Sequence, residues 1–521
     1  MNFPPYDPTS LPPDTPSLDV PDVQFYHDDL EKVSIGSNYF SSSGLLASGC
    51  NSLTYLGDFE PQRSCAESVA SSSSGSHWPA PNLHPKSDVT GERLETPNAK
   101  NSIIAAWDYA QDFGPKVIWP PGRAIDNEEF DPEGAMPVVL QSISNLGIVD
   151  DPVFKEMGCF YSTFLARYMY DYAAVRNIIM PRVCQRLQLS DSLKHGMLST
   201  AILYRANYEG SMLTARLRKY ATEHYLLAAR RLELELQSGR SSPWVNLASL
   251  IELANYAYHA GNLSDYYYYI SQAAVAVRLA IGGNSLDLLT LRGAHTFDVR
   301  YFAWCDILHS MALSRPTLLN YESDLHQTDA VGDNHADPDR GIEWVVGCPD
   351  ILIVLFARIT ALRHAHLSTE EKITRGSEIE QLIRGLQFRL ARARHPILRV
   401  ARLGAHEIWR HTAILYVHQA VFKSDSSHPV VKDSVKQVIR IASTLKPGVN
   451  PDCFLPVPYF IAGFFANSEK DRYNLKNRIL GCGNERYLRH LASALDDLWN
   501  ETDTTGRLVT WSTKQPPAFL F

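Results

Sequence analysis

Apolar residues recur along most of this chain at the spacing of helices. From about Pro137 onward they return every three to four positions, the period of one face of an α-helix. Helices are expected over 151–170, 190–207, 211–237, 244–260, 264–281, 297–314, 349–366, 369–394, 398–423, 429–445, 468–480 and 484–501. Alternating strand patterns are nearly absent. The sequence therefore predicts an all-α fold, an array of roughly a dozen antiparallel-packed helices with short connections.

Two of these helices carry patterns that predict which side chains are buried. The helix over 211–237 gathers its large residues on one stripe, namely Leu213, Leu217, Tyr220, Leu227 and Leu234. A heptad assignment would place His224 and Arg231 at the seam, which favours globular packing over a coiled coil. The tyrosine run 266–269 lies in another helix, where consecutive residues point in different directions. Part of the run is expected in the core and part in solvent.

The first hundred residues differ from this helical part in composition. They hold 17 Ser and 12 Pro, and such a segment cannot bury enough apolar surface to become ordered. We expect residues 1–100 to be a disordered acidic tail, 101–136 a transitional linker, and 137–521 the helical body. Within the tail, 18–30 and 53–60 interleave carboxylates with large apolar groups, which is typical of activation segments. A merely solubilising tail is the alternative.

Charge is divided unevenly between the tail and the body. The whole chain has a net charge of -8, and residues 1–100 alone carry 5 basic and 13 acidic groups. The remaining 421 residues carry 44 of each, so the body is neutral. A protein that binds nucleic acid by itself usually shows a basic excess, because phosphate neutralisation supplies much of the affinity. The charge therefore disfavours direct DNA binding by this chain.

Candidate catalytic and metal-binding patterns fail on their spacing. His406 and His411 lie five positions apart, about 140° around a helix, and cannot share a metal from one helix. His411 and His418 share a face without a third ligand, so we expect them on a polar face. The stretch 333–339 has Pro338 where a calcium loop needs glycine. With no phosphate loop or nucleophile elbow either, the sequence predicts no enzyme activity, no cofactor and no metal.

The cysteines and the apolar segments indicate a soluble, intracellular protein. All 8 cysteines are scattered, and no two have the spacing of a zinc site, so we expect reduced, structural thiols. No stretch approaches the roughly 18 uninterrupted apolar residues of a membrane span. The N-terminus lacks the basic start and apolar run of a signal peptide.

Five phrases of the sequence follow one another between about 155 and 515. They are 302–310 continuing to 316, 347–352, 409–418, 455–463 followed by 471–472, and 494–499 followed by 503–506 and 511. In this order they resemble the fungal-specific transcription factor regulatory domain, in the second of its common forms. The residues that carry the resemblance are Trp304, Asp306, Arg315, Pro316, Gly347, Cys348, Pro349, Tyr416, Pro456, Gly463, Asp471, Arg472, Leu498, Trp499, Asp503, Gly506 and Trp511. The resemblance implies an all-helical regulatory module of a nuclear transcription regulator, serving dimerisation and effector response.

Several of these residues have plain structural roles. Arg315-Pro316 is expected to end a helix, since proline has no N–H to continue it. Gly347 and Pro349 are expected to set a helix entry. Asp306 with Arg315 is a candidate ion pair between helix ends, as are Asp471 and Arg472 with other partners.

The chain departs from the resemblance in its cysteines. Members of this family usually carry a six-cysteine binuclear zinc cluster followed by a basic stretch, whereas here only Cys50 and Cys65 precede Cys159. We therefore expect a regulator without its own DNA-binding cluster, acting in the nucleus, with the cytoplasm as a second location. Its partners would be a homodimer or heterodimer with related regulators, and transcription machinery at the acidic tail. DNA contact would be indirect, and the effector molecule stays open.

Three other hypotheses fit the same sequence. A helical protein-interaction scaffold would keep the helix array without a transcriptional role. A truncated gene model would have lost the zinc cluster of a DNA-binding transcription factor. A small-molecule sensor, or an enzyme, would use a pocket inside the array, and its ligand would raise the melting temperature.

Overall fold

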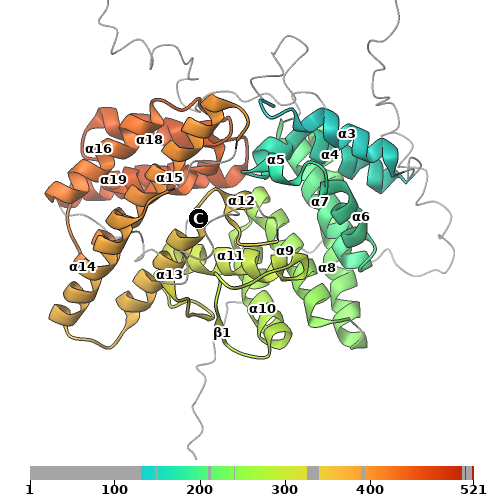
Figure 1. Cartoon of the computed structure of the whole chain (residues 1–521), viewed down its shortest axis with the longest axis horizontal. Coiled ribbons are helices and arrows are strands. Elements are labelled where there is room, and N and C mark those ends of the chain that lie inside the picture. Colours follow the sequence, from blue (N-terminus) through green and yellow to red (C-terminus); the bar gives the residue numbers. More distant parts are fainter. Residues whose placement is uncertain are drawn as a thin grey trace, which may run out of the picture. The chain divides into compact units, whose positions relative to one another are not determined.

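The computed structural model describes residues 131–146, 151–208, 213–239, 241–325, 339–388, 393–506, 511 and 519–521. Most of these residues are helical (Figure 1), which confirms the predicted all-α fold. The two named strands are β1, Ser285–Leu286, and β2, Asn320–Tyr321, which pair in parallel. The predicted tail and most of the calcium-like stretch 333–339 lie outside the described residues.

The first described helices form a packed group around α7. Their bounds are α3 Ala135–Asn145, α4 Pro152–Tyr168, α5 Tyr172–Val175, α6 Ile179–Leu187, α7 Asp191–Tyr208 and α8 Leu213–Ser238. Helices α7 and α8 pack against each other as an antiparallel pair, and α4 lies against α7. The carboxylate of Asp131 accepts the N–H groups of Ala135 and Met136, both at 2.8 Å. Because of this cap, α3 begins two residues before the predicted start of the body.

The predicted stripe of α8 is correct only at Leu217. Its buried residues are Leu217, Ala221, Tyr225, Ala228 and Leu232, which recur every three to four positions toward the neighbouring helices. The two ends of the predicted stripe, Leu213 and Leu234, are 44% and 53% exposed. The prediction followed the largest side chains, whereas close packing of helices also uses small alanines.

The next helices form a second antiparallel pair and the centre of the body. Their bounds are α9 Pro243–Ala260, α10 Leu263–Ile281, the short η2 Ala294–Thr296, and α11 Phe297–Leu313. Gly261 ends α9 with a φ of 68°, a left-handed value that favours glycine. Tyr266 and Tyr269 are buried and Tyr268 is 58% exposed, which confirms the prediction for the tyrosine run.

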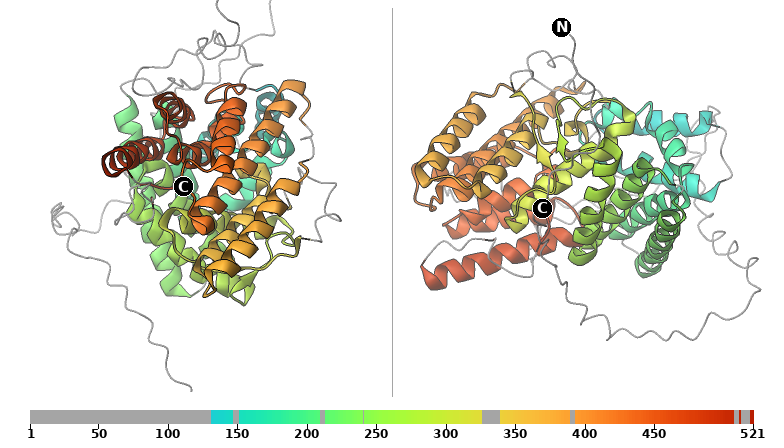
Figure 2. Two further views of the ribbon diagram at one scale, coloured as in Figure 1. Left: turned by 90° about the vertical axis from the view of Figure 1, so that its left-hand side faces the viewer. Right: turned by 90° about the horizontal axis from the view of Figure 1, so that it is seen from below.

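The remaining helices extend the array to the C-terminus. Their bounds are α12 Glu343–Val346, α13 Asp350–His364, α14 Thr369–Gly385, α15 Pro396–Val417, the π-helical turn η4 His418–Phe422, α16 Pro429–Ala442, η5 Asp452–Phe454, α17 Pro456–Phe464, α18 Glu469–Gly481 and α19 Arg486–Thr505. Helices α17, α18 and α19 pack against one another, and α15 lies against α16 and α17 (Figure 2).

The structure corrects several predicted helix bounds. Helix α14 ends at Gly385 rather than at 394, because glycine is a poor helix former. The sequence also missed the short helices α5, α6, α12 and α17. Helix α17 has two prolines in its first turn, Pro456 and Pro458. Both stand in the first turn, where a helix makes little use of the backbone N–H, and every residue of α17 is buried.

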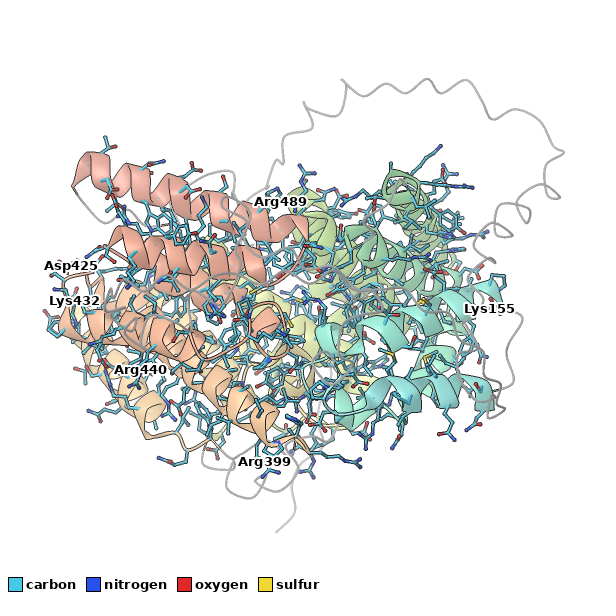
Figure 3. The ribbon with its side chains drawn as sticks, turned by 90° about the horizontal axis from the view of Figure 1, so that it is seen from above. Lys155, Arg399, Asp425, Lys432, Arg440 and Arg489 are labelled. Carbon is cyan, nitrogen blue, oxygen red and sulfur yellow. The ribbon has the colours of Figure 1, made fainter. Side chains whose placement is uncertain are left out.

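Charged side chains fall into an exposed set and a buried set. The exposed set includes the residues labelled in Figure 3, namely Lys155, Arg399, Asp425, Lys432, Arg440 and Arg489. In the buried set, Arg402 is fully buried, and it donates to Asp171 at 3.1 Å and to the Tyr170 carbonyl at 2.7 Å. Buried charge of this kind holds segments together because each lost partner would leave an uncompensated ion.

Candidate functional site

A cavity of about 480 Å³ lies among helices α4, α6, α9, α10, α11, α12, α15, α17 and α19. Its volume falls in the range of small-molecule sites in proteins. Much of its lining is aromatic and comes from helices far apart in the sequence. Representative wall residues are Tyr161, Tyr168, Tyr258, Tyr301, Trp304 and Trp409.

Helices α9 and α11 supply Tyr258, Tyr301 and Trp304 to the cavity, and both helices are buried on nearly all sides. A helix that is apolar around most of its circumference belongs in the centre of an array. Tyr301 and Trp304 stand on α11, and the Tyr301 hydroxyl donates to the amide oxygen of Asn255 on α9 at 2.9 Å. The rings of Trp304 and Trp409 meet edge to face, with centroids 5.7 Å apart. The wall is therefore held in place by contacts between helices.

One end of the cavity is formed by exposed residues. Gln185 and Leu189 near the end of α6, with Ala294 and His295 in η2, line the cavity and are exposed. Trp244 at the start of α9 packs edge to face on His295, with centroids 5.6 Å apart. We assign the entrance of the cavity to this end.

A buried ion network lies just inside the entrance. Arg186 of α6 contacts Asp298 at 2.9 Å and Glu252 at 3.0 Å. The two carboxylates outweigh the effect of burial and raise the pKa of Arg186, so the guanidinium stays charged. Burial raises the pKa of Glu252, an effect that Arg186 opposes. These residues link α6, α9 and α11 at the cavity wall.

The other arginines that line the cavity also have acidic partners. Arg182 contacts Asp339 at 2.7 Å. Arg167 donates to the Tyr208 hydroxyl at 2.7 Å, and that hydroxyl donates to Glu485 at 2.9 Å. Among the described residues, each arginine of the lining is thus balanced by a carboxylate, directly or through a hydroxyl.

Three thiols line the inner part of the cavity. They belong to Cys305, Cys453 and Cys482, none of which forms a disulfide. Burial raises the pKa of Cys305 and of Cys453 to about 12, and it raises that of Cys482 as well. A thiol with such a pKa stays protonated at neutral pH and is a poor nucleophile. The cavity therefore offers apolar thiols rather than reactive thiolates.

Two tryptophans of the cavity wall carry donors that the protein does not use. Trp344 of α12 and Trp409 of α15 are 4% and 1% exposed, and both line the cavity. Their indole N–H groups have no hydrogen-bond partner among the described residues. Buried donors in proteins nearly always have an acceptor. The two indole N–H groups are exceptions to this rule, and because their nitrogens have no accessible surface they lie within the packed wall.

Comparison with known proteins identifies the family. The model of the fungal specific transcription factor domain matches residues 154–515. The chain belongs to this family. No curated protein and no solved structure matches the chain. The match runs from α4 through α19 and includes nearly all of the cavity lining, so the cavity is a feature of the fungal specific transcription factor domain in this chain.

The structure places the family phrases mostly at contacts between segments. Asp306 of α11 accepts the N–H groups of Leu318 at 2.9 Å and Leu319 at 3.2 Å, and the Tyr321 hydroxyl at 2.8 Å. Among the described residues, Asp306 bonds these groups rather than Arg315. The expected ion pair of Asp306 with Arg315 is therefore replaced by these hydrogen bonds. Arg315 and Pro316 follow the end of α11, where Ser314 has a φ of 50°.

The glycine phrase makes a close contact that the sequence did not predict. Gly347 has a φ of 75°, and a Cβ there would lie 2.5 Å from the ring of Tyr170. Cys348 is fully buried, and Pro349 immediately precedes α13. In the third phrase, the Tyr416 hydroxyl shares a 2.9 Å hydrogen bond with Thr360. These contacts join α13 to α15 and to the segment after α4.

The last phrases join α17, α18 and α19. The Trp499 indole N–H donates to the Gly463 carbonyl at 2.9 Å, and the Trp511 indole donates to the Met311 carbonyl at 3.1 Å. Arg472 contacts both carboxylate oxygens of Asp503 and lies over the Trp499 ring. The other phrase residues here are placed as follows: Pro456 starts α17 and lines the cavity, Asp471 is in the first turn of α18, Leu498 is buried, and Gly506 follows α19.

The histidines do not gather into a metal site. No group of three metal-ligating side chains occurs in the described part of the chain. His411 lies 3.3 Å from the Ser434 hydroxyl, and His418 is 3% exposed and contacts Glu380 at 3.5 Å. The prediction that His418 stands on a polar face is therefore wrong, because η4 turns its ring toward α14.

Of the residues that carried the family resemblance, Trp304 and Pro456 line the cavity. Sequence reasoning missed Arg186, Glu252 and Asp298, which come from three helices. Only the three-dimensional arrangement shows that they meet. No helix of the described ranges has the length and apolarity that a membrane span requires.

Proposed function

We propose that this chain regulates transcription in the nucleus, with residues 137–521 as its regulatory module. The family match over residues 154–515 carries this proposal, since it spans the helices from α4 to α19. Residues 1–100 would act as an acidic activation segment and 101–136 as the linker to the module.

We further propose that a partner supplies the contact with DNA. The neutral charge of residues 101–521 supports this, because a DNA-binding surface needs a basic excess to neutralise phosphates. These 521 residues also contain no six-cysteine set with paired spacing. The partner would be a second copy or a related regulator that carries a zinc cluster, and the acidic segment would contact transcription machinery.

Chromatin immunoprecipitation with a tagged full-length chain tests the regulator function. We expect enrichment at promoters. A matched copy without residues 1–100 should keep this enrichment and lose activation of the nearby genes. Exclusion of the full chain from the nucleus would contradict the proposal.

A mobility-shift assay tests the indirect contact separately. The purified full chain is expected to bind no duplex DNA at physiological salt, whereas a complex with its partner should bind. Sub-micromolar binding by the chain alone would overturn the partner requirement and leave the regulator function intact.

A further inference from the structure

Three cationic side chains come together where α13, α14 and η4 pack on one another (Figure 1). They are Arg363 in the last turn of α13, Lys372 of α14 and Lys423 directly after η4, and we call them the cationic cluster. We propose that Lys423 is an acylation site, whose amine takes an acyl group from a thioester with a phosphorylated carrier. Such a modification goes beyond the proposed regulation and does not depend on how the chain reaches DNA.

Hydrogen bonds to oxygens of the protein hold the cluster in place. The Lys372 amine donates to the Arg363 carbonyl at 3.0 Å, and the Lys423 amine donates to the Gln419 carbonyl at 3.4 Å. The Arg363 guanidinium donates to the side-chain oxygen of the same Gln419 at 3.3 Å. The fold therefore keeps the Lys423 amine close to other cations, although like charges repel.

The two lysines of the cluster contact no acidic side chain in the described part of the chain. Glutamates stand nearby on α14, but Glu371 and Glu380 each bond an arginine of their own helix. The repulsion between Lys372 and Lys423 is therefore not offset by a carboxylate from these residues.

This arrangement favours the neutral form of the Lys423 amine. Partial burial, and then Arg363 and Lys372, lower the pKa of Lys423 to about 8. Burial and the three cations also lower the pKa of His364, so a second group experiences the charge of the cluster. At about pH 7.5, roughly a quarter of the Lys423 amines would be neutral, against about one in a thousand for an ordinary lysine. A neighbouring cation activates a lysine nucleophile in this way.

The reaction needs only the amine and an activated acyl group. Lys423 is exposed, so a donor in solution reaches its amine. The nitrogen attacks the carbonyl carbon of the thioester, the C–N bond of an amide forms, and the C–S bond breaks. The thiolate leaves with the electron pair and takes up the proton that the nitrogen loses. Arg363 and Lys372 would attract the phosphates of the carrier, which brings the thioester to Lys423.

Acetyl transfer to two lysines of the same chain tests the proposal. The full chain would be incubated at about pH 7.5 with acetyl-coenzyme A or with S-acetyl-N-acetylcysteamine, a thioester without phosphates. Peptide mass spectrometry would follow acetylation of Lys423 and of Lys432, an exposed lysine of α16 outside the cluster (Figure 3). With the uncharged donor we expect Lys423 to react about tenfold faster, because the gain in neutral amine exceeds the loss in basicity. The ratio should be larger with acetyl-coenzyme A and decrease at high salt.

Variants of Lys372 test the contribution of the cluster. Lys372→Gln removes one repelling charge, so it should slow the reaction of Lys423 with the uncharged donor about threefold and leave Lys432 unchanged. Lys372→Arg keeps the charge and should keep the rate. In denaturant the cluster is lost, and the two lysines of the unmodified chain should react at equal rates.

Several results would overturn this proposal. Equal rates at Lys423 and Lys432 in the folded chain would exclude the acylation site, as would a difference that persists in denaturant. An equal ratio with the two donors would exclude the phosphorylated carrier. The measurements on the unmodified chain decide the matter even where a variant fails to fold. Nuclear exclusion of the chain would contradict the regulator function and leave these rates unchanged, so the two failures are distinguishable.

Discussion

The wall of the cavity and the cluster of α17, α18 and α19 use the same residue type in opposite ways. In the C-terminal cluster, Trp499 donates to Gly463 and Trp511 to Met311, so each indole N–H is bonded within the protein. At the cavity, the indole N–H groups of Trp344 and Trp409 have no partner among the described residues. One region is closed by its own hydrogen bonds, and the other buries two indole donors without an acceptor among the described residues.

Buried charge shows the same contrast. Asp452, fully buried beside α17, accepts from Tyr459 at 2.5 Å, from Arg478 at 3.1 Å and from the Gly448 N–H at 2.8 Å. Asp298 at the cavity shares Arg186 with a second carboxylate, Glu252. In the C-terminal cluster one carboxylate, that of Asp452, contacts Arg478. In the cavity wall two carboxylates, those of Asp298 and Glu252, contact Arg186.

The largest loss of stability is expected from removing the buried carboxylate of the C-terminal cluster. Asp452→Ala would leave the buried Arg478 without its carboxylate, so we expect a loss of about 3–5 kcal/mol in the free energy of unfolding. Asp298→Ala should cost less, because Arg186 keeps Glu252. Urea denaturation of the full chain measures both. An equal loss of unfolding free energy in the two variants would contradict this difference between the C-terminal cluster and the cavity wall.

The second effect depends on pH and concerns Glu343, the neighbour of Trp344. Burial and the nearby Asp350 and Asp171 raise the pKa of Glu343 to about 8, so its contact with His406 at 3.3 Å is one of a neutral carboxyl at pH 7. A raised pKa stabilises the folded state at low pH. That stabilisation is lost as the pH rises from the pKa of glutamate in the unfolded chain, about 4.3, through the pKa of Glu343 in the folded protein.

The variant Glu343→Gln should lack this pH dependence. Between pH 5 and pH 8, its stability relative to the unmodified chain should rise by about 1.4 kcal/mol per pH unit. Denaturation curves at several pH values measure the difference. Parallel stability profiles for the two proteins would show that Glu343 is ionised in the fold.

A smaller effect compares the two kinds of tryptophan. Trp499→Phe removes a buried hydrogen bond to the Gly463 carbonyl, which keeps the Ala466 N–H as a donor. Trp344→Phe removes a donor that has no protein acceptor. We expect the first to destabilise the fold by about 1–2 kcal/mol more than the second. Denaturant midpoints provide the test, and a greater loss in Trp344→Phe would contradict the assignment of its donor.

The smallest effect is expected at the exposed pair of Arg472 and Asp503. Asp503 is 58% exposed, and a surface ion pair gains little over hydration. Asp503→Ala should leave the melting temperature within error of the unmodified chain. A clear drop would mean that this exposed pair, rather than the buried packing of the two helices, fixes α18 against α19.

The sequence predicted the long helices well because proline and glycine mark their ends. Pro243 and Gly261 bound α9, and Pro396 starts α15. The helix α17, which starts with Pro456 and has Pro458 in its first turn, was not among the predicted helices. The buried face of α8 was mispredicted because Ala221 and Ala228, which pack closely, carry little weight in a count of large residues.

The cavity was beyond prediction for a physical reason. Its ion network joins α6, α9 and α11, and neither the spacing nor the composition of the sequence indicates that these helices meet. Trp344 lies in the four-residue helix α12, which has no periodic pattern to detect. The family phrases were easier to recognise because they are local, and most of them serve packing.

Nuclear magnetic resonance of indole-labelled protein tests the contrast between the two regions most directly. The indole N–H signals would be assigned in the full chain with the four Trp→Phe variants at 344, 409, 499 and 511. We expect the indole protons of Trp499 and Trp511 to resonate downfield of those of Trp344 and Trp409, because a hydrogen bond to a carbonyl oxygen deshields the proton. Equally downfield signals for Trp344 and Trp409 would contradict the account.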